Sequence, residues 1–170
     1  ALMKDLEPLP LSDKISGAPH PSEAITIFGQ DSAQQQFLNA FDRGRLHHAW
    51  LLSGPRGVGK ATLVWKIAKF LLTKPNAPAQ DGLFGAMSQH VSNLETPPDH
   101  PALPRILAGS EPALCVLRRS YDEKRKRFKQ NITVDDVRSL KSFFGLSAAD
   151  GGARVVIIDA ADDLTGSAAN

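Results

Sequence analysis

Continuous apolar runs occur at three places along the chain and predict three buried strands. They cover residues 48–53, 113–117 and 153–159. Runs of this length, bounded by glycine, proline or polar residues, are typical of strands that are covered by other elements. The third run is apolar up to its final acid, which predicts a strand buried on both faces.

Helical spacing of apolar residues marks three further segments. We expect one helix to begin near Asp31, a second to cover 62–72, and a third to open at Thr133. Asp136 follows Thr133 by three positions, which is the spacing of a capping box. The side chains expected to face the core are Phe37, Leu38, Phe41, Leu63, Ile67, Phe70, Leu71, Val134, Val137, Leu140 and Phe144.

Strands that alternate with helices predict an α/β fold with a parallel sheet and flanking helices. Residues 1–24 are proline-rich and are expected to form an extended or disordered leader. Residues 25–170 are expected to form one partial nucleotide-binding-type domain. Within it, 74–112 is an irregular insert, with short helices expected at 84–94 and 102–108.

The turn between the first strand and the second helix carries the main candidate chemistry. Residues 54–61 read GPRGVGKA and match seven of the eight positions of the phosphate-binding pattern G-x-x-x-x-G-K-[ST]. Glycines let the backbone wrap around phosphate oxygens, the helix start offers free N–H groups, and Lys60 adds a charge. The alternative is a glycine-rich turn that binds nothing.

Two positions that normally handle metal or water carry alanine. Ala61 replaces the hydroxyl that would hold Mg²⁺, and Thr62, one residue later, is turned by about 100° around the helix. Asp159 ends the third strand, where a carboxylate can reach Mg²⁺, or can instead cap the following turn. Ala160 stands where active ATPases of this type carry a second acid. Together the two alanines indicate that hydrolysis is not the task of this chain.

The composition of the chain excludes only a few classes of protein. The chain has 170 residues, a net charge of +2 and a hydrophobic content of 42%. This suits one domain, and the charge alone does not imply a nucleic-acid partner. Cys115 is the single cysteine, so neither an internal disulfide nor a four-cysteine zinc site is expected, in keeping with a cytoplasmic protein. No run approaches the roughly 18 apolar residues of a membrane span.

Positive charge is concentrated in residues 118–129, which hold seven cations and two acids. One interpretation is a patch that contacts the phosphates of DNA. The other is a solvated loop or hairpin between a strand and a helix. Tyr121 and Phe128 are too few aromatics to argue for stacking on bases. The candidate nucleic-acid contacts are Arg118, Arg119, Lys124, Arg125, Lys126 and Arg127.

Several blocks together resemble the bacterial clamp-loader AAA+ family, above all its delta-prime branch. They are 27–30 (IFGQ), 44–52 (GRLHHAWLL), the P-loop, 132–138 (ITVDDVR) and 154–162 (RVVIIDAAD). The resemblance spans residues 25–170 and implies a P-loop AAA+ (RecA-like) parallel sheet with flanking helices. It also implies that the later strands, the lid and the collar domain are missing.

The resemblance implies an optional ATP or ADP site and no required cofactor. Phe28 and Gly29 would lie near the adenine, and Asp159 would hold Mg²⁺ only with a bound nucleotide. No zinc is expected, since Cys115 cannot build the family's zinc module alone. The implied nucleotide contacts are Phe28, Gly29, Gly54, Gly57, Val58, Gly59, Lys60, Ala61 and Thr62.

The resemblance implies a mainly structural (stator) role in loading the sliding clamp, within the DNA polymerase III nucleotidyltransferase complex. Implied partners are other loader subunits and, through them, the sliding clamp and primer-template DNA, with no membrane partner. A missing central strand would leave an apolar seam, so the chain is expected either to self-associate or to shift its elements to cover the seam. The alternatives are an active tau- or gamma-like motor ATPase and a small-molecule P-loop kinase.

Overall fold

A computed structural model describes residues 9–74, 91–145 and 152–170 of the chain. The chain forms two compact units, each of which is described by itself. The helical unit consists of residues 21–114 and 147–155. The sheet unit consists of residues 1–20, 115–146 and 156–170.

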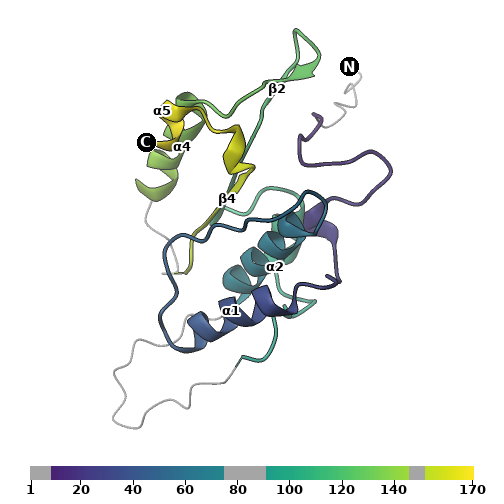
Figure 1. The fold of residues 1–170 in the computed structure, drawn as a ribbon, viewed down its shortest axis with the longest axis vertical. Coiled ribbons are helices and arrows are strands. Elements are labelled where there is room, and N and C mark those ends of the chain that lie inside the picture. Colours follow the sequence, from purple (N-terminus) through teal and green to yellow (C-terminus); the bar gives the residue numbers. More distant parts are fainter. Residues whose placement is uncertain (1–8, 75–90, 146–151) are drawn as a thin grey trace. The chain divides into compact units, whose positions relative to one another are not determined.

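Helices build the helical unit. They are η1 (Pro21–Glu23), α1 (Asp31–Asp42), α2 (Lys60–Thr73) and α3 (Ala102–Leu107). Figure 1 shows α1 and α2 side by side. Phe37 and Leu38 of α1 and Leu63 and Phe70 of α2 form the core of the unit, together with Leu94 from outside these helices.

The helix predicted near Asp31 is confirmed, and so is the burial of Phe37 and Leu38. Phe41 stacks edge-on against Phe70 with ring centroids 5.0 Å apart, which is a favourable aromatic geometry. The N-cap is Gln30, so Asp31 lies in the first turn instead. Its carboxylate is well placed there, because a helix N-terminus carries partial positive charge.

Helix α2 is buried on more sides than its sequence pattern predicts. Leu63 and Phe70 face α1 as expected, while Trp65 and Ala68 are also buried. On a further side, the Lys69 ammonium donates to the carbonyl oxygens of Ser22 at 2.8 Å and Ala24 at 3.3 Å. Burial, and then the charge of Lys66, lowers the pKa of Lys69. The helix is therefore the central element of its unit.

The strand predicted at 48–53 is wrong. This segment has no strand geometry, and Leu51 is 80% exposed. Leu52 packs against the core, and Trp50 meets Phe37 with centroids 5.5 Å apart. A strand needs neighbouring strands to pair its backbone groups. The sheets of the described residues contain no partner for 48–53.

The irregular insert contains one helix in the part that the structure describes. The helix predicted at 102–108 is confirmed as α3. The one predicted at 84–94 falls largely on 75–90, outside the described residues, and 91–94 is not helical. The backbone N–H of Val91 donates to the Asp42 carboxylate at 3.2 Å, which ties the insert to the end of α1.

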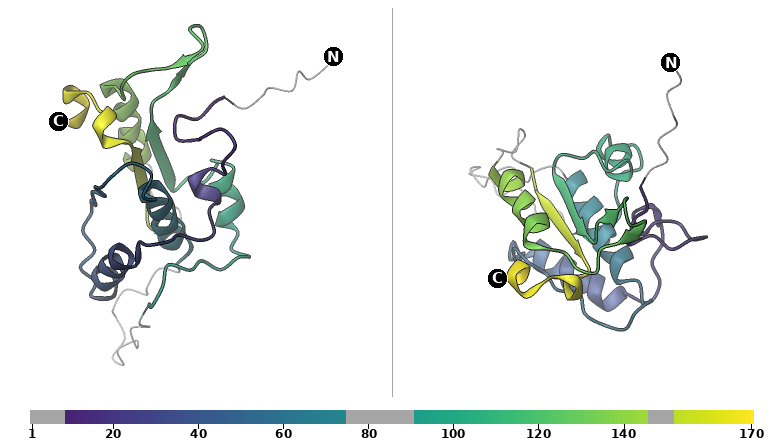
Figure 2. Two further views of the ribbon diagram at one scale, coloured as in Figure 1. Left: turned by 45° about the vertical axis from the view of Figure 1, so that its right-hand side comes forward. Right: turned by 90° about the horizontal axis from the view of Figure 1, so that it is seen from above.

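The sheet unit contains two small sheets. Strands β1 (Leu114–Arg118) and β4 (Val155–Asp159) form a parallel pair that starts at the unit boundary. Strands β2 (Tyr121–Asp122) and β3 (Arg127–Phe128) form an antiparallel hairpin. Figure 2 shows α4 (Val134–Gly145) alongside β4. The chain ends in η2 (Ala161–Asp163) and α5 (Gly166–Ala169).

Both strand predictions for this unit are confirmed, but β4 is not buried on both faces. Ile157 is buried, whereas Ile158 is 40% exposed. Successive side chains of a strand point to opposite faces, so β4 has one covered face. In the described residues β1 is its only neighbouring strand, which explains why the continuous apolar pattern is not matched by burial.

The capping box predicted at the start of α4 is confirmed. The backbone N–H and the hydroxyl of Thr133 both donate to the Asp136 carboxylate, at 2.8 and 2.7 Å. The predicted burial of one face of α4 is wrong. No described residue of this helix is buried, and Phe144 is 59% exposed. Beside α4, Ile132 is fully buried and bridges Leu164 in parallel.

Candidate nucleotide-binding site

The predicted P-loop is formed at the start of α2. Its three glycines have positive φ angles, 144° at Gly54, 86° at Gly57 and 93° at Gly59. Residues other than glycine rarely adopt these backbone angles, so the turn requires the glycines. Helix α2 begins at Lys60, directly after Gly59. The sequence pattern therefore produces the expected loop, although the strand predicted before it is absent.

Lys60 folds back onto this loop. Its ammonium donates to the carbonyl oxygens of Gly54 and Pro55, each at 2.8 Å. These two bonds hold the charge at the centre of the turn and close the loop around it. A phosphate oxygen placed in the loop would meet the same ammonium, since an ammonium has three donors and can exchange partners.

The donor set of the loop fits a phosphate better than a metal–phosphate pair. The backbone N–H of Leu63 donates to the Gly59 carbonyl oxygen at 2.9 Å, and the N–H groups that precede it at the start of α2 are the ones a helix offers to an anion. Ala61 supplies only a methyl group where a Mg²⁺ ligand would stand. Thr62 lies on the next position of the helix and is partly buried. These residues suit the phosphates of ATP or ADP and leave Mg²⁺ without its P-loop ligand.

The segment implied to lie near the adenine packs against the P-loop. Gln30 donates its side-chain amide to the Val58 carbonyl oxygen at 2.7 Å. A Cβ at Gly59 would contact the Ile27 side chain at 3.8 Å. Phe28 is 85% exposed, and Gly29 has a φ of 69°. The contacts of Ile27 and Gln30 thus bring the segment that carries Phe28 and Gly29 to the phosphate loop, and the adenine contact of these two residues stays a prediction.

Gln30 is a site residue that the residue patterns did not identify. Its role depends on a contact between residues 28 positions apart in the sequence. The available signal was its place directly after Phe28 and Gly29 in the block that resembles the clamp loaders.

Asp159 belongs to the sheet unit, so its position relative to the P-loop stays a prediction. Its carboxyl is half-buried at the end of β4. Burial raises its pKa above the usual value, and the charges of Asp13 and Asp163 add to this effect. The cations Arg118 and His20 oppose the shift.

A buried ion-pair cluster lies beside Asp159. The Arg118 guanidinium donates to both oxygens of the Asp13 carboxylate, each at 2.7 Å. His20 Nε2 lies 3.0 Å from the same carboxylate, whose side chain is only 2% exposed. Asp13 was not among the expected site residues because it lies in the proline-rich leader. Whether the leader ends at residue 24 stays a prediction.

The six candidate nucleic-acid contacts divide into two groups. Arg118 is paired with Asp13, and Arg119 lies 3.0 Å from Asp163. The other four lie on the hairpin, all exposed: Lys124, Arg125, Lys126 and Arg127. Arg118 and Arg119 therefore form ion pairs within the sheet unit, whereas the four hairpin cations are exposed to solvent.

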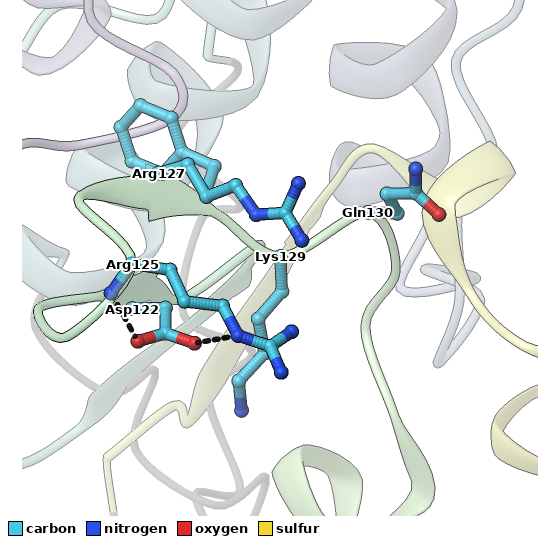
Figure 3. Close-up of a pocket in the computed structure, with 6 residues that line it drawn as sticks. Asp122, Arg125, Arg127, Lys129 and Gln130 are labelled. Atoms are coloured by element: carbon cyan, nitrogen blue, oxygen red, sulfur yellow. Dashed lines mark hydrogen bonds and ion pairs between the residues drawn. The ribbon is translucent and has the colours of Figure 1, made fainter.

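A shallow pocket lies along one side of this hairpin. Figure 3 shows Arg125 held against the Asp122 carboxylate, with the Arg127 side chain extending in the same direction. Lys129 and Gln130 complete the lining together with Phe128. The pocket is therefore predominantly cationic.

Metal-ligating residues do not cluster in the described parts of the chain, where no group of three His, Cys, Asp or Glu side chains could enclose an ion. The absence of a zinc module stays a prediction that rests on the single cysteine. None of the described helices is both long and apolar enough to cross a bilayer.

Comparison with known proteins yields a family match over most of the chain. The family described as DNA polymerase III, delta subunit, matches residues 29–170.

Curated relatives carry related names. DNA polymerase III subunit delta' of Pseudomonas aeruginosa is 33% identical over 128 residues, which are 75% of this chain and 33% of that protein. Subunit gamma of Buchnera aphidicola subsp. Schizaphis graminum is 49% identical over 51 residues, or 30% of this chain and 14% of that protein. Subunit tau of Escherichia coli K12 is 39% identical over 51 residues, or 30% of this chain and 8% of that protein. The chain thus spans at most about a third of the length of these relatives.

Proposed function

The chain belongs to the DNA polymerase III clamp-loader family, and from this premise we propose that it acts as a delta-prime-type subunit. In this role it is a mainly structural component of the loader that places the sliding clamp on DNA during replication. The similarity to subunit delta' covers 75% of the chain, more than the similarity to gamma or tau does. The small-molecule kinase alternative has no support from any of these matches.

The single observation that carries the structural role is Ala61 in an otherwise formed P-loop. Lys60 and the free N–H groups of the turn can hold phosphates. Mg²⁺ would have no hydroxyl at position 61, and Ala160 provides no acid to orient an attacking water. The site is proposed to bind ATP or ADP without hydrolysing it, so that bound nucleotide would stabilise the domain and drive no cycle.

An active motor ATPase remains the second candidate, because the 51 residues shared with subunit gamma are 49% identical. The two candidates differ in one measurable respect. A motor subunit needs a metal-assisted attack on the γ-phosphate, whereas a structural subunit needs only a folded site.

The deciding experiment measures ATP binding and turnover with and without Mg²⁺. We expect binding that hardly responds to Mg²⁺ and no turnover above background. Restoring the missing hydroxyl in Ala61→Ser should make binding Mg²⁺-dependent, while Ala61→Gly, a control without a hydroxyl, should not. ATP turnover by the unaltered chain that disappears in Lys60→Ala would establish the motor role and overturn the structural one.

Assembly with other clamp-loader subunits is part of the proposal, with the sliding clamp and primer-template DNA reached through the complex in the cytoplasm. Self-association is a further part. It rests on the sheet edge that β4 presents in the described residues, where β1 is its only neighbouring strand. Light scattering across protein concentrations tests this, and a concentration-independent monomer would remove self-association from the proposal.

A further inference from the structure

A short β-hairpin separates β1 from α4 in the sheet unit. Tyr121 pairs with Phe128, and Asp122 pairs with Arg127. The two aromatic rings of the first pair meet edge to face with centroids 5.3 Å apart. The N–H of Lys129 donates to the Ser120 carbonyl oxygen at 2.9 Å, which closes the base of the hairpin.

The turn of the hairpin is fixed by its own residues. Asp122 accepts a hydrogen bond from the N–H of Arg125 at 3.0 Å, the bond of an aspartate that caps a turn. Lys126 occupies the left-handed region, with a φ of 50°. Two strands, an aromatic pair and a capped turn therefore hold a four-residue tip, residues 123–126, in one conformation.

This tip is where the positive charge of the chain is gathered. Residues 122–129 contain five cations and two carboxylates, whereas the whole chain has a net charge of only +2. Asp122 is occupied by the turn and by Arg125, whose Nε lies 3.8 Å from it. All the cations of the segment are exposed, and Figure 3 shows Arg125 and Arg127 extending to the same side.

We propose that this basic hairpin, residues 122–129, binds the phosphate backbone of double-stranded DNA without reading its sequence. The inference rests on the proposed function, which brings the chain to primer-template DNA. Closely spaced Lys and Arg side chains on this tip can neutralise successive phosphates and release their counterions. The hairpin presents no exposed aromatic ring and no short polar side chain suited to reading base edges.

The chemistry of the hairpin favours duplex DNA over other anionic partners. Single-stranded DNA is usually held by stacking bases on aromatic rings, and here Tyr121 and Phe128 face each other. Stable binding to lipid surfaces or to protein partners usually combines charge with an exposed apolar or aromatic side chain, which residues 122–129 lack. Backbone phosphates require only charge at suitable spacing.

The test is fluorescence anisotropy of the full chain with two unrelated 30-base-pair duplexes across a range of salt concentrations. The altered hairpin is Lys124→Gln/Lys126→Asn, since Asn tolerates the left-handed backbone at 126. The matched control is Arg43→Gln/Arg45→Gln, which removes the same charge from exposed positions after α1. Thermal unfolding of each variant confirms that the fold is retained.

We expect the hairpin variant to bind about 8-fold more weakly for each lost phosphate contact at 0.1 M salt. The slope of the logarithm of the binding constant against the logarithm of the salt concentration should decrease in magnitude by about 0.9 per contact, equally for both duplexes. The control should bind as the unaltered chain does. Equal losses in both variants, or no loss in the hairpin variant, would overturn the proposal.

A separate measurement distinguishes this failure from failure of the proposed function. Co-purification with gamma and delta subunits reports on the clamp-loader role and does not require the hairpin charges. Intact co-purification with no effect of the hairpin on DNA binding would overturn the hairpin alone. Failure of the unaltered chain to co-purify with these subunits would overturn the proposed function.

Discussion

The ammonium of Lys60 lies 2.8 Å from the carbonyl oxygen of Gly54, so the lysine that should meet a phosphate is held by the loop itself. The bond spans six residues and closes the turn. It holds the positive charge of the lysine at the loop in the absence of a ligand. A nucleotide phosphate can therefore use the third donor of the ammonium or replace one of its two carbonyl partners.

Replacing Lys60 with alanine should weaken ATP and ADP binding by about 10- to 100-fold. A hydrogen bond from a charged donor contributes about 1.5–3 kcal/mol, and each 1.4 kcal/mol is tenfold in affinity. Isothermal titration calorimetry measures the change. Lys66→Ala, later on the same helix, serves as the control and should leave both affinities unchanged. Equal affinities for Lys60→Ala and the unaltered chain would show that the P-loop does not hold the phosphates.

The sheet unit offers a second testable contact, between Arg118 and Asp13. Removing the guanidinium in Arg118→Ala would leave a carboxylate that is 2% exposed without its main cation. Breaking one side of a buried pair typically costs about 3–5 kcal/mol, and the partial exposure of Arg118 favours the lower end. Urea unfolding measures this loss.

The matched control for Arg118→Ala is Arg138→Ala, which breaks an exposed pair with Asp135. Such surface pairs are worth about 0–1 kcal/mol, so this variant should remain close to the unaltered chain. The double variant Asp13→Asn/Arg118→Ala should recover part of the loss, because no unpaired charge stays buried. Similar small losses for Arg118→Ala and Arg138→Ala would mean that the leader does not dock through this contact.

Local features of the fold could be predicted from the sequence, and features that depend on distant partners could not. The Thr133–Asp136 capping box and the P-loop turn are set by residues within a few positions of each other. Strands β1 and β4 were identified because their apolar runs are continuous. The helix positions of Phe37 and Leu38 follow from spacing alone.

The failures share one physical cause. A strand at 48–53 requires neighbours that pair with its backbone, and the run of apolar letters carries no information on whether they exist. The Asp13–Arg118 pair joins residues 105 positions apart, so no periodicity could reveal it. Gln30 is a similar case at the P-loop. The helix face of α4 was predicted correctly as apolar, but its burial depends on what packs against it.

The Thr133–Asp136 cap predicts a defined response to acid. Burial tends to raise the pKa of Asp136, but the two hydrogen bonds from Thr133 and the charge of Lys129 lower it below its usual value. Since the pKa is lower in the folded chain, this carboxylate stabilises the fold above about pH 4 and loses that effect as pH falls further. Thr133→Ala should cost about 1 kcal/mol at pH 7.

Measured from pH 7 down to pH 2, the free energy of unfolding should fall more steeply for the unaltered chain than for Asp136→Asn. The variant should begin lower at pH 7, because an amide is a weaker acceptor than a carboxylate. Asp135→Asn, which alters an exposed neighbour in the same helical turn, controls for the change in charge. Parallel curves for the unaltered chain and Asp136→Asn would contradict the role of the cap.

Asp159 should respond in the opposite sense. Its pKa is raised, first by burial and then by the charge of Asp13, so the ionised carboxylate is less stable in the folded chain than in the unfolded one. Asp159→Asn removes that charge and keeps the shape. We therefore expect this variant to unfold at a higher temperature at pH 7. Because the unaltered chain itself gains stability as its carboxylate takes up a proton, the difference should shrink as pH falls toward about 4.

Differential scanning calorimetry at several pH values tests the role of Asp159, with the exposed neighbour in Asp162→Asn as the control. That variant should melt as the unaltered chain does at every pH. A lower melting temperature for Asp159→Asn at pH 7 would mean that Arg118 compensates the carboxylate fully and that the acid is structural. A higher melting temperature for Asp159→Asn would show that the carboxylate destabilises the fold. If the double variant Ala61→Ser/Asp159→Asn also loses any effect of Mg²⁺ on ATP binding, Asp159 is an acid that destabilises the fold and serves a ligand.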